Sequence, residues 1–151
     1  MKTFSDLLAT NVSSAVTVVF ELEPVSPGVA QRFHGRIEVC GQVVLDGEFP
    51  NNAMRFTVTG PLRAPVTVKV ALRNKRPELL PIGQDLAFLA SLTVNSCPVL
   101  PDWQDEIEYV TEDGEQLIPT HYLGHNGKWE FSTKLPFYQW LHAHRPWGWT
   151  I

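Results

Sequence analysis

The histidines and carboxylates are the residues of this chain best suited to metal or acid–base chemistry. His121 and His125 lie four residues apart, a spacing that places two imidazoles on one side of a helix. Turn-forming residues surround them, Pro119 before and Asn126-Gly127 after, so we expect no helix there. The chain has no His-Glu-x-x-His motif. We therefore expect turn or surface histidines, no metal and no cofactor, and a metal-assisted hydrolase is kept as the third alternative.

Paired acids are also present, as a glycosidase requires. Asp102 with Asp105 and Glu106 with Glu108 all fall within one short segment, whereas a glycosidase places its two carboxyls across a cleft. No Gly-x-Ser-x-Gly nucleophile elbow occurs, and the two cysteines, Cys40 and Cys97, have no neighbouring histidine. The sequence predicts free thiols and a protein that is not an enzyme.

Aromatic residues favour binding over catalysis. Residues 122–151 hold half of the chain's sixteen aromatics. Trp faces stack on sugar rings or anchor protein contacts. Three tryptophans stand in loop-like or terminal contexts near polar residues, and we predict a ligand or interface set of Trp103, Trp147, Trp149, His144 and Arg145. Four further aromatic residues have the spacing of core residues. We therefore expect burial of Trp129, Phe131, Phe137 and Trp140.

Charge is unevenly distributed along the chain. Residues 49–77 carry basic side chains and no acid, whereas residues 102–115 carry seven acids. These blocks form two solvated faces or pair across a subunit interface. For pairing, the predicted residues are Arg73, Lys75 and Arg76 against Asp105, Glu106 and Glu108. A net charge of −4 argues against nonspecific binding to nucleic acid.

The elements that must position these residues are strands. Alternating apolar residues predict them over 16–23, 31–40, 42–49, 54–59, 66–73, 86–95, 107–111, 116–121 and 129–133. Asn126-Gly127 is the strongest hairpin signal, and Cys97-Pro98 and Pro101 are predicted to interrupt the strands. Pro136 to His142 suits a short helical turn. We predict one all-β domain over residues 1–151, a β-sandwich or jelly roll of about nine strands with an aromatic-rich C-terminal segment, 122–151.

We expect neither an export signal at the start nor a membrane span in this sequence. Asp6 interrupts the short apolar start, and no stretch approaches the roughly 18 apolar residues of a membrane span. We expect a protein made in the cytoplasm that does not bind membranes.

Part of the sequence resembles calcium-dependent xylan-binding modules, which are small β-sandwiches. The resemblance is carried by Val66 to Lys75, Gln84-Asp85-Leu86 and Ser91 to Asn95. The chain departs from the family pattern where Lys75 follows Asn74, Leu86 follows Asp85 and Ser96 follows Asn95. The resemblance implies the fold and sugar recognition, without most of the calcium ligands.

The C-terminal part resembles β-sandwich proteins of tailed-phage virions. The motif is Asn126-Gly127-x-Trp129-x-Phe131 followed by Pro136-Phe137-Tyr138-x-Trp140-Leu141. It implies a tail, fibre or capsid accessory protein that binds other copies of itself and other virion proteins after assembly in the host cytoplasm. The leading hypothesis is this non-enzymatic homo-oligomeric virion protein. The alternative is a carbohydrate-binding module that uses exposed tryptophans to bind a surface glycan.

Overall fold

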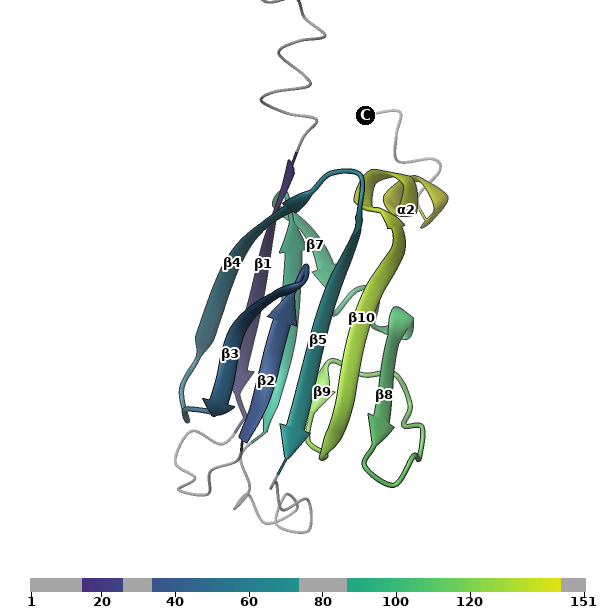
Figure 1. Cartoon of the computed structure of the whole chain (residues 1–151). Helices are drawn as coiled ribbons and strands as arrows, with labels where there is room; N and C mark the ends of the chain where they lie inside the picture. The colour runs from purple at the N-terminus through teal and green to yellow at the C-terminus, as the bar shows by residue number, and fades with distance from the viewer. Residues whose placement is uncertain (1–14, 26–33, 74–86, 145–151) are drawn as a thin grey trace, which may run out of the picture.

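A computed structural model describes residues 15–25, 34–73 and 87–144 as two facing antiparallel sheets (Figure 1). Sheet A has the order β4 (Met54–Pro61), β1 (Ala15–Pro24), β6 (Phe88–Val94), β7 (Cys97–Leu100), and β9 (Tyr122–Leu123) also pairs with β6. Sheet B has the order β3 (Gln42–Glu48), β2 (His34–Val39), β5 (Pro65–Arg73), β10 (Gly127–Pro136), β8 (Ile107–Thr111). A 3-10 turn, η3 (Gln104–Glu106), precedes β8, and helix α2 (Phe137–His144) follows β10. The predicted β-sandwich is confirmed.

The core lies between the sheets and follows from period-two alternation. β1 buries Val16, Val18, Phe20 and Leu22, and β5 buries Val66, Val68, Val70 and Leu72. Across the interior, the rings of Phe20 and Trp129 lie 5.9 Å apart. Intervening residues on each strand therefore point to solvent, and they form the two outer faces.

The four aromatics predicted to be buried form part of this core. Trp129, Phe131 and Phe137 are 0% exposed and Trp140 is 2% exposed. Trp140 on α2 packs edge-on against Phe131, at 6.1 Å and 87°, and stacks with Phe137. The predicted helical turn is also confirmed, and these contacts close the sandwich at its α2 end (Figure 1).

Two predictions for individual segments were wrong or incomplete. The break expected at Cys97-Pro98 is strand β7, because Asn95 and Ser96 adopt φ angles of 49° and 67° and turn the chain tightly out of β6. Only the first strand of the expected hairpin over 107–121 forms. Residues Glu115–Leu117 hold to β8 through hydrogen bonds from Thr111 N to Glu115 O and from Leu117 N to Tyr109 O, both 2.8 Å.

Asn126-Gly127 joins no hairpin. β9 before it pairs with β6 in sheet A, whereas β10 after it pairs with β5 and β8 in sheet B. The chain thus crosses between the sheets here. Gly127 has a φ of 143°, and a Cβ at this position would lie 2.1 Å from the carbonyl oxygen of Val110. The glycine is needed for close approach to β8.

Among the described helices, none is long and apolar enough to cross a membrane.

Candidate functional site

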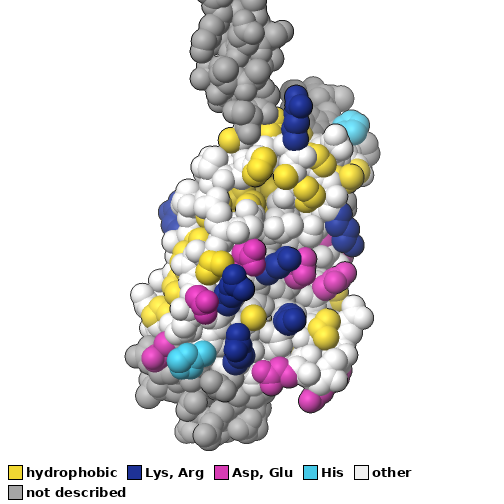
Figure 2. All heavy atoms as spheres, viewed as in Figure 1, with side chains coloured by type: hydrophobic (Ala, Val, Ile, Leu, Met, Phe, Trp, Pro, Cys, Tyr) yellow, Lys and Arg dark blue, Asp and Glu magenta, His cyan; other side chains and the backbone are white. Residues whose placement is uncertain are grey.

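The outer face of sheet B places four basic side chains around one alanine. Arg36 of β2 and Lys128 of β10 both lie directly opposite Ala71 of β5 in the strand registers. Lys69 and Arg73 are two residues before and after Ala71 on the same strand, so all five side chains point outward. The four basic residues are exposed. Figure 2 shows dark-blue side chains gathered over the middle of this face.

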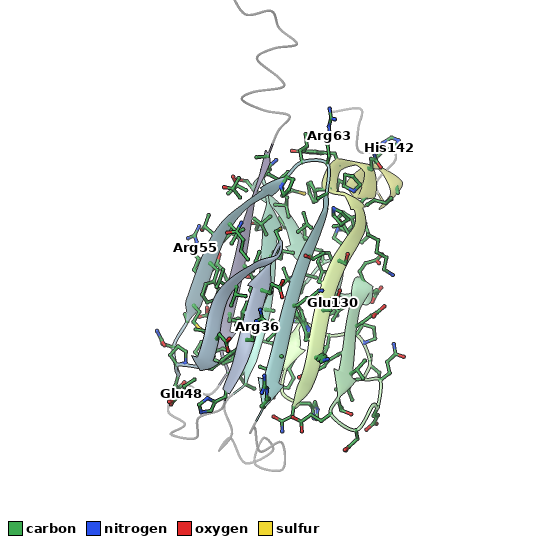
Figure 3. All side chains as sticks on the ribbon, viewed as in Figure 1. Arg36, Glu48, Arg55, Arg63, Glu130 and His142 are labelled. Carbon is green, nitrogen blue, oxygen red and sulfur yellow. The ribbon has the colours of Figure 1, made fainter. Side chains whose placement is uncertain are left out.

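Acidic side chains lie beside these cations. Lys69 has Glu38 opposite on β2 and Glu130 opposite on β10, and Arg36 has Asp46 opposite on β3. The labelled Arg36 and Glu130 can be followed on their strands in Figure 3. Glutamates therefore lie among the cations on this face, and Figure 2 shows magenta among blue over the same area.

The small side chain of Ala71 leaves a hollow in this face. One depression of about 300 Å³ is lined by residues that include Arg36, Lys69, Ala71 and Lys128, with Glu38 and Glu130 among them. A second, of about 420 Å³, runs from Ala71 and Lys128 past Arg73 to the end of β8. Since both include Ala71 and Lys128, they form one open surface. We name it the Ala71 trough, formed by Arg36, Lys69, Ala71, Arg73 and Lys128.

Of the predicted binding tryptophans, the structure describes Trp103 alone. Its ring is half-buried and packs edge-on against Trp140, with centroids 5.5 Å apart and an angle of 75°. One edge of Trp103 is thus part of the core contact, and its role in binding stays a prediction. Trp147, Trp149 and Arg145 lie outside the described residues, and His144 ends α2 with its side chain not described.

The described part of the basic block is divided between the two outer faces of the sandwich. Arg55 lies on the outer face of sheet A, opposite Glu21, whereas Lys69 and Arg73 lie on the outer face of sheet B. Alternation and strand order divide the basic block in this way, because β4 and β5 belong to different sheets.

The acidic residues predicted to pair with the basic block lie in η3 and on β8, the edge strand of sheet B. Asp105 and Glu106 are in η3, and Glu108 in β8 lies opposite Glu130. Lys75 and Arg76 fall outside the described residues. Pairing of the two blocks between copies stays a prediction.

The histidine pair has structural hydrogen bonds. His121 Nδ1 lies 2.7 Å from Gln104 Oε1, which also accepts a bond from the His121 backbone N–H. The backbone of His125 bonds to the hydroxyl of Tyr109, whose burial raises its pKa. In residues 15–25, 34–73 and 87–144, no group of three or more His, Cys, Asp or Glu side chains is placed to hold a metal.

Asn95, the last residue of the xylan-module resemblance, is held in place locally. Its side-chain oxygen accepts a bond from Thr17 N, and its amide nitrogen donates to Tyr138 Oη, each at 2.8 Å. Both polar atoms therefore fix the β6–β7 turn to neighbouring elements. Asn74 and Asp85 of the same resemblance lie outside the described residues.

The Ala71 trough was not predicted as a site, although the sequence carries part of its signal. Lys69, Ala71 and Arg73 alternate with buried residues, so the outward phase of β5 is readable. The contributions of Arg36 and Lys128 depend on which strands pair and in which register, which a single sequence does not give.

Comparisons with known proteins assign no family to the chain. No family model matches the sequence, and no curated protein matches it. Two solved structures of a calcium-dependent carbohydrate-binding module, vCBM60, resemble the chain at 13% identity. The selenomethionine form covers 77% of this chain and 89% of its own, with a TM-score of 0.44. The complex with galactobiose covers 76% and 96%, with a TM-score of 0.45.

Proposed function

We propose that the protein is a non-catalytic module that binds a polysaccharide across the outer face of sheet B. The observation that carries the proposal is the Ala71 trough, an open depression that crosses several strands and continues to the end of β8. Small ligands are usually bound in concave, mostly apolar pockets that enclose most of their surface. An open, polar depression suits an extended chain instead.

The chemistry of the trough fits a hydroxyl-rich polymer. Guanidinium and ammonium groups of Arg36 and Lys128 donate hydrogen bonds, and the carboxylates of Glu38 and Glu130 beside them accept bonds from hydroxyls. Hydrogen bonds to charged groups contribute a net of about 1.5–3 kcal/mol each, so a few such contacts along one chain are enough for measurable binding.

The trough differs from the aromatic platform expected from the sequence. Trp129 lies beneath it and is 0% exposed, so its ring faces the core. Sugar binding here would depend on hydrogen bonds and shape. Stacking on Trp103, Trp147 or Trp149 would be a separate contribution.

A steric variant tests the proposal. In native gels containing soluble polysaccharides, the wild-type protein should be retarded by at least one polymer. Ala71→Phe fills the trough and should abolish that retardation, whereas Thr57→Phe, the matched change on the exposed outer face of sheet A, should keep it. Free mobility in every neutral and acidic polymer would rule out the proposal, as would retention of binding in Ala71→Phe.

The virion hypothesis is a second candidate, supported by an apolar surface near α2. Leu135 is 44% exposed and Tyr138 is 39% exposed, and Pro65 pairs with Pro136 beside them. Figure 2 shows yellow side chains gathered at this end of the face. The expected result is a defined oligomer by light scattering that dissociates in Leu135→Asp. A monomer at all concentrations would contradict it.

A further inference from the structure

We infer that the four cations of the Ala71 trough form a subsite for the anionic group of an acidic sugar, either a uronate carboxylate or a sulfate ester. The inference rests on the proposed function, because it names the class of polysaccharide that the trough binds. It assigns the anion to the centre of the face, above the methyl group of Ala71.

The first argument is geometric. Directly opposite residues in neighbouring antiparallel strands lie about 5 Å apart, and alternate residues on one strand lie about 7 Å apart. Arg36, Lys128, Lys69 and Arg73 are therefore the nearest outward neighbours of Ala71 in all four directions. A long side chain at position 71 would fill the space between them. Alanine leaves that space open to a ligand.

The second argument concerns charge compensation. Lys69 and Arg36 have carboxylates directly opposite on neighbouring strands. Lys128 lies between Ala71 and Val110, and Arg73 lies opposite His34. Like charges placed close together on a sheet repel, and an anion held among them relieves this repulsion. Glu112 lines the depression beside Lys128 and Arg73, and neither cation has a carboxylate directly opposite in the registers of the described strands.

The carboxylates beside the cations select the kind of polymer. Glu38, Glu130 and Glu108 flank the cations along neighbouring strand positions. A uniformly charged polyanion would bring its next charges against these carboxylates, which costs free energy. A polymer whose acidic units are separated by neutral, hydroxyl-bearing units avoids this repulsion. It places one anion over Ala71 and hydroxyls over the glutamates.

A matched pair of polymers tests the charge requirement. Hyaluronan alternates uronate and neutral sugars, and its carboxyl-reduced form differs in the carboxylates alone. We expect hyaluronan to bind at least about tenfold more tightly by calorimetry, the ratio given by loss of one charge-assisted contact of about 1.4 kcal/mol. Carboxyl-reduced chondroitin sulfate separates the two anion types, because it keeps the sulfate esters and lacks the carboxylates. Binding of this polymer as tight as that of hyaluronan would assign the subsite to sulfate.

Charge-neutral variants test the residues. Lys128→Gln and Arg36→Gln should each weaken hyaluronan binding about three- to tenfold. Arg55→Gln, an exposed arginine on the outer face of sheet A, is the matched control and should leave it unchanged. Affinity should also fall with added salt in the wild-type protein, and less steeply in the variants.

A carboxylate built into the trough gives a readout without any polymer. In Ala71→Glu the new side chain can reach the surrounding cations, so this variant should melt at a higher temperature than Ala71→Gln at low salt. Added sodium chloride should reduce the difference, because salt screens exposed charges. Equal melting temperatures at low salt would show that the cations create no site for an anion and would overturn the inference.

The outcomes separate the inference from the proposed function. If both forms of hyaluronan bind equally and the glutamine variants match wild type, the polysaccharide function stands and the anion subsite is wrong. If no polysaccharide binds, both are wrong. Tighter binding of single-stranded oligothymidylate than of any polysaccharide would also overturn the inference.

Discussion

The outer faces of the two sheets have the same architecture and different chemistry. On sheet A, Val19 of β1 lies between Thr57 of β4 and Thr93 of β6, and Thr17 lies opposite Thr59. On sheet B, the equivalent central position is Ala71, between Arg36 and Lys128. One face has short, β-branched side chains over its centre, and the other has long charged side chains around a hollow.

The difference is informative because neither outer face is constrained by the core. β-Branched residues pack well on a pleated surface, so the centre of sheet A has the composition expected from strand stability alone. Alanine is depleted in strands, and clustered like charges oppose folding, so the centre of sheet B departs from that expectation. Departures of this kind are expected where a surface binds something.

The largest expected effect comes from a change that distorts sheet B alone. In Gly127→Ala, a Cβ would meet the carbonyl oxygen of Val110 at 2.1 Å and the φ of 143° would be strained. We expect a loss of about 3 kcal/mol or more in the free energy of unfolding, measured with urea.

Gly114→Ala is the control for that prediction. Gly114 has a φ of 86° with no atom within 4 Å of a built Cβ, so it carries the backbone strain without the clash. It should lose about 1 kcal/mol. Hydrogen exchange in Gly127→Ala should increase in β8 and β10 more than in β1 and β4, and a uniform increase would contradict the local effect.

The second prediction concerns the irregularity in β10, where its register with β5 shifts between Ser132 and Pro136. Thr133 is 2% exposed, and its hydroxyl accepts a bond from Val66 N at 3.0 Å and donates to the carbonyl of Leu135. Thr133→Val keeps the shape and leaves both backbone groups without this partner, so unfolding free energy should fall by about 1–3 kcal/mol. Ser132→Ala, at a half-buried neighbour, should cost less, and an equal loss in both would argue against the buried hydroxyl.

A third change makes the centre of sheet B resemble that of sheet A. Ala71→Val introduces the side chain found at Val19 and raises strand propensity, so we expect a gain of up to about 0.5 kcal/mol in unfolding free energy. The same change partly fills the Ala71 trough and should weaken polysaccharide binding several-fold. Urea denaturation measures the expected gain in stability, and calorimetry on the same sample measures the expected loss of affinity. A variant that is more stable and binds equally well would mean that the hollow has no role.

The smallest expected effect is found where the two sheets meet. Cys40 follows β2 in sheet B, and a Cβ at Gly60 of β4 in sheet A would lie 3.1 Å from its Sγ. Burial raises the pKa of the Cys40 thiol. The folded protein therefore keeps this proton at pH values where the unfolded chain loses it. Stability is fully present below the unfolded thiol pKa and falls as pH rises towards the folded value.

The variant Cys40→Ala isolates this contribution. Between about pH 7 and about pH 10, the wild-type protein should lose slightly more stability than the variant. Tyr109, whose pKa is also raised by burial, is common to both proteins and cancels in the comparison. The measurement is the difference in urea midpoints at each pH, and a larger loss in the variant would contradict the sign.

The sequence predicts the fold well because alternation alone defines the core side of each strand. β1 and β5 bury the apolar residues that their patterns indicate, and Trp129 and Trp140 are buried as their spacing indicates. β7 escapes prediction because it is four residues long, contains Pro98 and ends before Pro101. The crossing between the sheets at Gly127 is not predicted, because a glycine occurs both in hairpin turns and where two backbones approach closely.

The candidate site is less predictable than the fold. From residue type, the sequence predicts Trp103 as a binding residue, and the ring of Trp103 packs on Trp140. It also predicts a basic block, whose described residues are divided between the two outer faces because side chains alternate along each strand. The Ala71 trough combines β2, β5 and β10, whose site residues are 33 or more positions apart between strands. Only the register brings them together.

Both described ends of the domain lie at its α2 end. Ala15 at the start of β1 pairs with Pro61, and α2 follows directly on Pro136, which pairs with Pro65 across the short connection from β4 to β5 (Figure 1). The trough lies on a side of the sandwich, away from that end. A neighbour attached through either end would leave it clear, so several copies joined in this way could engage one polymer at once. Weak single contacts would then add up to avid binding through effective concentration.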